Sequence, residues 1–139
     1  MTSEFALALS AIVYMDHVKG ICSSEVLAQK ICTNPARIRK VMGNLKRSGL
    51  VVTKEGMDGG YSFAKDAASV TLKDVLCAVG TKAVPPSCRL NSMQAESDCC
   101  LEMSRIMEAV YGKLNASCEK ALDKITVLEI KNRLYPKED

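Results

Sequence analysis

The chain has 139 residues, of which 47% are hydrophobic and 25% are charged. That length and composition suit one domain with a packed core, or a small domain with a dimerising arm, and they exclude disorder over the whole chain. No apolar run reaches the roughly 18 residues that a membrane helix requires, and no secretory signal pattern is visible, so we expect a cytoplasmic protein without membrane contact.

Few side chains are available for catalysis. The chain has seven cysteines but one histidine and no tryptophan. Histidine is the usual proton carrier near neutral pH, and neither a Cys-x-x-Cys pair nor a glycine-rich phosphate loop accompanies the thiols. The odd cysteine number favours reduced thiols over a disulfide framework. We therefore expect that the protein is not an enzyme.

Basic residues are concentrated in the first half of the chain. Residues 1–70 carry nine Lys and Arg against six Asp and Glu, whereas residues 71–139 carry ten of each. A patch of one sign repels itself in the folded protein, so it indicates a polyanionic partner; a solvated helix face is the alternative. The segment 26–54 holds seven basic side chains and no acidic one, namely Lys30, Arg37, Arg39, Lys40, Lys46, Arg47 and Lys54.

Two helices are predicted before residue 33. Residues 3–19 carry apolar side chains at helical spacing and stop before Gly20. A short second helix follows, with Ser23 or Ser24 as its N-cap, and ends near Cys32. Its expected buried side chains are Val26, Leu27 and Ile31.

A third helix has clearer boundaries. Asn34 can cap the free amides, Pro35 suits the first helical position, and Gly49 follows the last residue, Ser48. Because this helix exposes the basic residues and follows a short helix, the pair predicts a helix-turn-helix. Its expected apolar stripe is Ile38, Val41, Met42 and Leu45.

A β-hairpin is predicted next. Residues 50–54 and 61–64 have strand character, and the glycine-rich segment 55–60 joins them. Three helices followed by a hairpin indicate a winged helix-turn-helix over residues 1–70. The expected fold is therefore mainly α-helical with a small β-hairpin wing.

Residues 71–139 are expected to hold a sensing loop and dimerisation helices. Thr71 and Gly80 bracket a fourth helix, and the proline-containing loop 81–99 follows. A long helix begins near Cys100, and a last short helix restarts at Thr126. The apolar seam of the long helix is too extended for one small chain to cover, which predicts a homodimer with a long C-terminal dimerisation helix. Its expected residues are Met103, Met107, Val110, Leu114, Cys118 and Ala121.

Three cysteines near the start of the long helix are candidates for redox sensing. Cys99 and Cys100 fall in its first turn, where free amides favour a reactive thiolate. Cys88 lies in the preceding loop and could form a disulfide with either. Core packing is the expected role of the other four cysteines, which lie on or beside helices: Cys22, Cys32, Cys77 and Cys118, the last of them in the predicted dimer seam.

Several segments together resemble a bacterial repressor family that includes the iron-sulfur-assembly regulator, the nitric-oxide sensor and the cysteine-metabolism repressor. These are EFALAL at 4–9, NPARIRKV at 34–41, LKRSGLV at 45–51, GGY at 59–61 and TVLEI at 126–130. The resemblance extends over nearly the whole chain. It implies a homodimeric transcriptional regulator that acts as a repressor and binds a pseudo-palindromic operator in double-stranded DNA.

The resemblance also implies the DNA-contacting residues. The start of the third helix would enter the major groove, and the wing would touch the backbone or minor groove. Family wings often hold a basic residue beside the glycines, where this chain has Glu55, Met57 and Asp58. The implied contacts are Ser24, Asn34, Pro35, Ala36, Arg37, Arg39, Lys40, Asn44, Lys46, Arg47, Lys54, Gly59, Gly60 and Tyr61.

Members that bind an iron-sulfur cluster carry three evenly spaced cysteines before the long helix. Cys88 and Cys100 match the first and third, whereas residues 93–94 stand at the middle place and Cys99 is additional. Some members take a further ligand from the partner's first helix, at a position similar to Glu4. The resemblance thus implies a cluster held by these three thiols and this carboxylate, with thiol sensing or incidental thiols as alternatives.

The leading hypothesis is a regulator whose operator affinity responds to a redox, thiol or iron-sulfur event in the 88–100 segment. Such an event would shift a two-state equilibrium and change the spacing of the two recognition helices. Two alternatives remain open: a winged-helix module that binds an acidic protein without DNA, and a regulator that senses a small-molecule ligand. The dependence of DNA affinity on salt separates the first alternative from the leading hypothesis.

Overall fold

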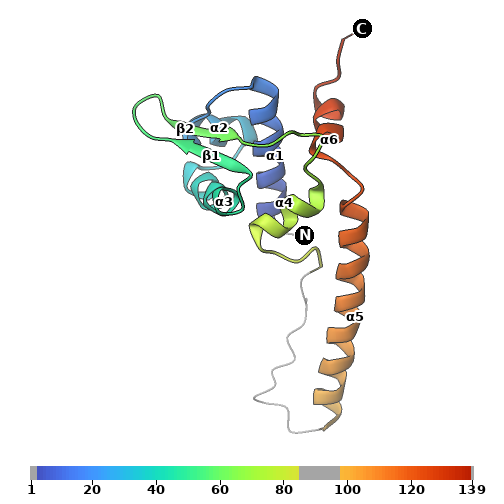
Figure 1. Ribbon diagram of the computed structural model, residues 1–139. Coiled ribbons are helices and arrows are strands. Elements are labelled where there is room, and N and C mark those ends of the chain that lie inside the picture. Colours follow the sequence, from blue (N-terminus) through green and yellow to red (C-terminus); the bar gives the residue numbers. More distant parts are fainter. Residues whose placement is uncertain (1–2, 85–97, 139) are drawn as a thin grey trace.

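The computed structural model describes residues 3–84 and 98–138, and it confirms the predicted fold class (Figure 1). The described residues form helices around a central helix, a two-stranded wing and one long helix that extends away from the rest. In chain order the elements are α1 (Ser3–Val18), α2 (Ser24–Ile31), α3 (Pro35–Arg47), β1 (Val51–Lys54), β2 (Gly60–Phe63), α4 (Leu72–Val79), α5 (Asp98–Leu122) and α6 (Val127–Leu134).

Helices α2 and α3 begin with side-chain caps. The Ser23 hydroxyl accepts a hydrogen bond from the Val26 amide at 3.2 Å, and the Asn34 side-chain oxygen accepts one from the Arg37 amide at 3.0 Å. Pro35 follows at the first helical position, where its missing N–H costs nothing. The start of the recognition helix is therefore fixed by local chemistry.

The end of α3 is also fixed by contacts between neighbouring residues. The Gly49 amide donates to the Lys46 carbonyl and the Leu50 amide to the Leu45 carbonyl, both at 3.0 Å. Gly49 has a φ of 82°, the left-handed conformation that this paired closure requires. The closure buries Leu50 and leads the chain directly into β1.

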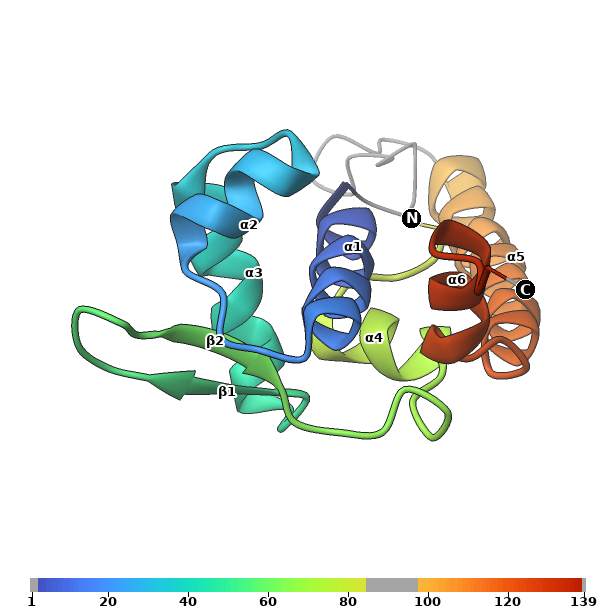
Figure 2. The same ribbon diagram turned by 90° about the horizontal axis from the view of Figure 1, so that it is seen from above.

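Helix α1 lies at the centre of the domain, with α2 and α3 on one side and α4 and α6 on the other (Figure 2). Three of its side chains, Ala8, Ala11 and Ile12, are 0% exposed. A helix enclosed on several sides needs apolar residues around most of its circumference, and α1 has them. The amino-terminal core is thus built around α1.

One predicted core position in α2 is wrong. Val26 is 40% exposed, whereas Leu27 and Ala28 are buried. The packed face of α2 follows Ser24, Leu27, Ala28 and Ile31, which are spaced three and four residues apart, and Val26 falls outside that row.

The wing is an antiparallel hairpin with the register Val51 opposite Phe63 and Lys54 opposite Gly60. The residues before α2 extend its sheet. Cys22 and Tyr61 exchange two backbone hydrogen bonds, each 2.8 Å long. The wing is consequently attached to the helix-turn-helix by these backbone hydrogen bonds as well as by the turn between α3 and β1.

The second half of the chain returns to α1. Backbone hydrogen bonds of 2.9 Å join Leu72 to Ile125 and Val127 to Val70, which ties the start of α4 to the turn between α5 and α6. Val127 is 0% exposed, and α6 packs beside α1. Both helices that meet at this link, α4 and α6, begin with a capping box.

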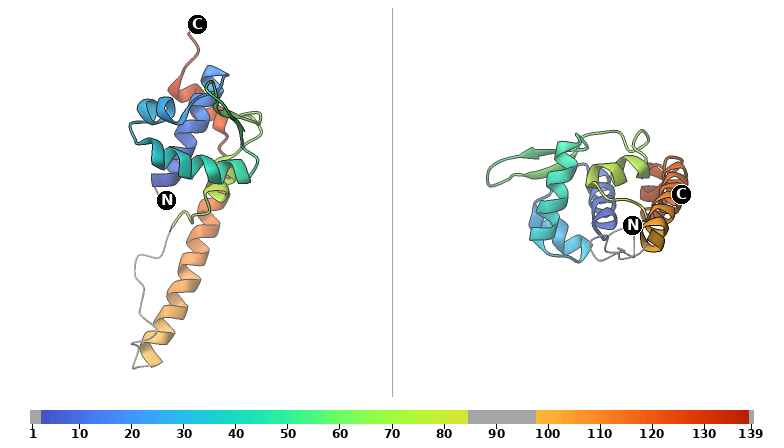
Figure 3. Two further views of the ribbon diagram at one scale, coloured as in Figure 1. Left: turned by 90° about the vertical axis from the view of Figure 1, so that its left-hand side faces the viewer. Right: turned by 90° about the horizontal axis from the view of Figure 1, so that it is seen from below.

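Helix α5 extends away from this link and leaves the domain (Figure 3). Among its described side chains only Leu122 is buried. Asn115 of α5 joins this helix to the segment that follows α4. The Asn115 side-chain amide donates to the Val84 carbonyl at 3.0 Å, and the Asn115 side-chain oxygen accepts from the Val84 amide at 2.8 Å. No helix within residues 3–84 and 98–138 is both long enough and apolar enough to cross a membrane.

Candidate nucleic-acid interface

Helix α3 separates apolar from cationic side chains. The predicted stripe of Ile38, Val41, Met42 and Leu45 is at most 1% exposed and packs into the core. Because these side chains fix one face of the helix, the opposite face must point to solvent. The exposed cations are Arg37, Arg39, Lys40, Lys46 and Arg47.

Two of these cations contact the first turn of α1. The Arg37 guanidinium donates to the Ser3 hydroxyl oxygen at 2.8 Å, and the Lys40 ammonium donates to a carboxylate oxygen of Glu4 at 2.8 Å. Lys40 nevertheless keeps 70% of its side chain exposed, whereas Glu4 keeps 26%. Local sequence patterns do not predict these contacts, because the partners are more than thirty positions apart in the chain.

The other flank of α3 contacts α2. Arg39 donates to the Ser24 hydroxyl at 3.3 Å and lies 3.8 Å from the Glu25 carboxylate. Ser24 is 9% exposed, so Arg39 donates to a largely buried hydroxyl. Asn44 accepts a hydrogen bond from Arg47. Among the predicted DNA contacts, Ser24, Asn34 and Asn44 thus have partners within the chain, and their contact with DNA stays a prediction.

The glycine pair of the wing is required by close packing. A β-carbon on Gly60 would lie 2.6 Å from the carbonyl carbon of Cys22 and 2.9 Å from the amide nitrogen of Ser23. A β-carbon on Gly59 would overlap the Lys54 carbonyl oxygen. Gly60 therefore lets the wing approach the amino-terminal end of α2, and Gly59 lets the hairpin loop close against Lys54. Tyr61 follows in β2 and is half-buried.

We expect Gly60→Ala to destabilise the protein by about 2 kcal/mol, because the added methyl group must push the wing away from Cys22. Chemical denaturation measures the change. Gly112→Ala is the matched control: nothing lies within 4 Å of its β-carbon position, and it should stabilise α5 by up to about 1 kcal/mol. Equal effects of the two substitutions would contradict the close-packing explanation.

The wing tip carries acidic and apolar side chains. Lys54, Glu55 and Asp58 are exposed, and Met57 is fully exposed. The two carboxylates outnumber the one ammonium, so the tip does not attract phosphate through its net charge. A wing contact with DNA would depend on Lys54 and on backbone amides near the glycines.

The cysteines differ in exposure. Cys99 and Cys100 are exposed in the first turn of α5, and Cys88 lies outside the described residues. Cys22 is buried, and burial raises the pKa of its thiol. The prediction of core packing is confirmed for Cys22 and is wrong for two others. Cys32 takes the exposed left-handed C-cap of α2, and Cys77 lies on the outer face of α4; Cys118 is half-buried against the core.

The predicted cluster ligands are not brought together within the described part of one chain. The first turn of α1, with Glu4, and the first turn of α5, with Cys99 and Cys100, lie far apart in both side views (Figures 1 and 3). Glu4 is occupied by Lys40. No group of three potential metal-ligating side chains occurs within residues 3–84 and 98–138. The described residues of a single chain therefore do not form a complete cluster site.

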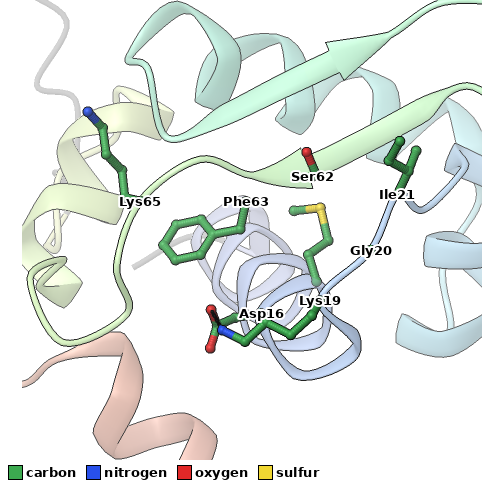
Figure 4. A pocket seen from close by; sticks show the side chains of 8 residues that line it. Asp16, Lys19, Gly20, Ile21, Ser62, Phe63 and Lys65 are labelled. Carbon is green, nitrogen blue, oxygen red and sulfur yellow. Dashed lines mark hydrogen bonds and ion pairs between the residues drawn. The ribbon is translucent and has the colours of Figure 1, made fainter.

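A buried carboxylate connects α1 with α6. Asp16 is 5% exposed, and its two oxygens accept hydrogen bonds of 2.7 Å from Lys19 and from Lys131. Burial by itself would raise the pKa of Asp16, but the hydrogen bonds and charges of Lys131 and Lys19 outweigh it and lower the pKa. Asp16 and Lys19 border a cleft between α1 and β2, whose far wall includes Phe63 and Lys65 (Figure 4).

The predicted seam of α5 is uncovered in the single chain. Met103, Val110 and Leu114 are between 41% and 48% exposed. Met107 and Cys118 are half-buried, and Ala121 is exposed. Ile106, which is 49% exposed, belongs to the same face although the sequence analysis did not include it. Its position three residues after Met103 and four before Val110 is the signal that could have found it.

A helix-turn-helix with a cationic second helix, a following hairpin and a long carboxy-terminal helix define a winged-helix transcriptional regulator. Comparison with known families specifies the type. The chain belongs to the Rrf2 family, described as iron-dependent transcriptional regulators, which matches residues 1–133.

Individual proteins agree with this class. The chain is 29% identical over 107 residues to YwgB of Bacillus subtilis strain 168, named as a helix-turn-helix-type transcriptional regulator; the match covers 73% of this chain and 69% of YwgB. A transcriptional regulator structure from Lactobacillus plantarum has a TM-score of 0.77 at 21% identity, covering 98% of this chain and 92% of that one. CymR, the global cysteine regulator of B. subtilis, has a TM-score of 0.67 at 16% identity, covering 96% of each chain. The two structures share the fold of this chain.

Proposed function

We propose that the protein acts as a homodimeric repressor that binds a pseudo-palindromic operator in double-stranded DNA. Residues 1–70 bind DNA, and residues 71–139 provide the dimer contact and the sensing cysteines. The observation that carries this proposal is the exposed face of α3, which presents five cations beside a wing. A helix of this kind fits the major groove, where Arg and Lys read guanine edges and neutralise nearby phosphates.

Operator binding should depend on the cations of α3. Arg37→Ala and Lys40→Ala should each weaken binding by about tenfold, or reduce the salt slope by about one where the contact is to phosphate. Fluorescence anisotropy with an operator selected from random sequence, repeated over a salt series, measures both. Lys137→Ala removes the same charge from the carboxy-terminal tail and should leave affinity unchanged.

A protein that showed no salt-dependent binding to any duplex would contradict the DNA-binding proposal. It would favour the alternative of a module that binds an acidic protein partner. Membership of a family of transcriptional regulators supports the DNA proposal over this alternative.

A second copy of the chain is the proposed occupant of the apolar face of α5. This face contains Met103, Ile106, Val110 and Leu114, and together they leave a long apolar strip exposed to water. Large exposed apolar patches are uncommon on monomeric proteins. Pairing of two α5 helices around a two-fold axis would cover the strip and present two α3 helices to the two half-sites of one operator.

The proposed regulatory event occurs at the thiols of Cys99 and Cys100, together with Cys88. Two observations support it: both described thiols are exposed, and they lie in the first turn of the proposed dimer helix. The family description as iron-dependent and the name of CymR as a cysteine regulator point in the same direction. If an iron-sulfur cluster is the effector, these thiols would hold it with Glu4 of the second copy.

Two measurements distinguish thiol oxidation from cluster binding as the regulatory event. In a thiol mechanism, peroxide takes two electrons and two protons from Cys88 and Cys99 or Cys100; one S–S bond forms and peroxide is reduced to water. Cys88→Ser should keep operator binding but remove its response to peroxide. Cys22 serves as an internal control, because its buried thiol should react with an alkylating reagent much more slowly than Cys99.

Iron and sulfide content of protein purified without oxygen tests the cluster mechanism. Stoichiometric iron and sulfide that are lost in Cys88→Ser would support it. Iron-free protein whose operator binding does not change with peroxide would contradict both the thiol and the cluster mechanism. It would favour control by a small-molecule ligand.

A further inference from the structure

Lys40 is the cation of α3 with the shortest ion pair among the described residues. Its ammonium lies 2.8 Å from Glu4, whereas the guanidinium of Arg39 lies 3.8 Å from Glu25. Glu4 is the less exposed member of its pair, at 26%, and belongs to a helix that is anchored in the core. The carboxylate is therefore held in place, and the more exposed lysine is the member that can move.

The two contacts between α1 and α3 differ in charge. Ser3 orients Arg37 by a hydrogen bond of 2.8 Å but leaves its positive charge intact. Glu4 orients Lys40 by a contact of the same length and cancels its charge at close range. Arg37 and Lys40 lie on one helix turn, but Arg37 meets a polyanion with its full charge, whereas Lys40 must first leave Glu4.

This difference affects two kinds of DNA binding unequally. Binding to DNA of random sequence rests almost entirely on the neutralisation of phosphates by cations. A lysine that keeps its own carboxylate contributes little to that term. At an operator, contacts with base edges are added. Their free energy can compensate for the ion pair that is lost when Lys40 leaves Glu4 and binds DNA.

We propose that Glu4 is a specificity-determining residue that acts through Lys40 and lowers the affinity of α3 for DNA of random sequence. This inference rests on the proposed DNA-binding function and adds a role for a residue outside the DNA-contacting helix. The ion pair contributes little to folding, since exposed pairs of this kind are weak. Its effect should appear in binding and not in stability.

The test compares Glu4→Gln with wild type on a short duplex of random sequence over a salt series. We expect roughly threefold to tenfold tighter binding at low salt and a logarithmic salt slope steeper by about 0.9, equivalent to one added phosphate contact. Operator affinity should rise less, so the ratio of operator to random-sequence affinity should fall. Thermal unfolding of Glu4→Gln should match wild type.

Three control variants make the result specific. Glu108→Gln changes the net charge equally on α5, and Ser3→Ala removes the neighbouring contact without a change in charge; neither should alter the slope. In a Lys40→Gln background, Glu4→Gln should add no further slope change. A Glu4→Gln slope equal to that of Glu108→Gln, or an effect that persists without Lys40, would overturn the inference. Absence of DNA binding by wild type would instead overturn the proposed function, and this inference with it.

Discussion

Leu114→Glu should convert the proposed dimer into monomers and weaken operator binding. Leu114 is 45% exposed in the single chain and lies within the apolar face of α5, four residues after Val110. In a two-fold interface the substitution buries two carboxylates, one from each copy, and each loses water without gaining a cation. We expect the dimer dissociation constant to rise by about 100-fold or more, which corresponds to about 3 kcal/mol. Analytical ultracentrifugation over a concentration series measures it.

Loss of the dimer should then reduce operator affinity, because a monomer contacts one half-site only. Leu134→Glu is the matched control. Leu134 is 60% exposed on α6, outside the apolar face of α5, so the same substitution there should leave the dimer intact. A monomeric wild-type protein, or a Leu114→Glu variant that remains dimeric, would refute the proposed interface.

The local boundaries of the fold could be predicted from the sequence because they depend on nearest neighbours. Asn34 and Pro35 start α3 and Gly49 ends it, and each acts within a few residues of its own position. The apolar stripe of α3 was predictable for the same reason, since helical spacing alone selects which side chains face the core.

Contacts between distant segments could not be predicted in this way. The pairing of Glu4 with Lys40 joins the first turn of α1 to the middle of α3 and depends on how the two helices pack. Exposure of the cysteines also depends on packing: Cys32 lies just beyond the buried row of α2, and Cys77 lies on an exposed face of α4. Composition classes cysteine as a core residue and cannot identify these exceptions.

The ion pair between Asp16 and Lys131 has the largest sequence separation of these contacts, because its members are 115 positions apart in the chain. Removal of this ion pair is the second change for which we expect a large effect. Asp16→Asn should lower the free energy of unfolding by about 3 kcal/mol, because it leaves the ammonium of Lys131, 20% exposed, without its carboxylate. Urea denaturation at neutral pH measures the loss. Asp58→Asn removes an exposed carboxylate from the wing tip and should change stability by less than about 0.5 kcal/mol.

The pH dependence identifies the carboxylate as the cause. The pKa of Asp16 is lower in the folded protein than its ordinary value, so the folded state binds the proton less readily than the unfolded state does. The stabilisation is therefore fully present above about pH 4, the ordinary pKa of an aspartate, and is lost as pH falls through the folded value. The difference between wild type and Asp16→Asn should stay constant from neutral pH down to that point and shrink below it. A difference that does not change in acid would mean that the asparagine acts through packing, and the charge of Asp16 would then not be what connects α6 to α1.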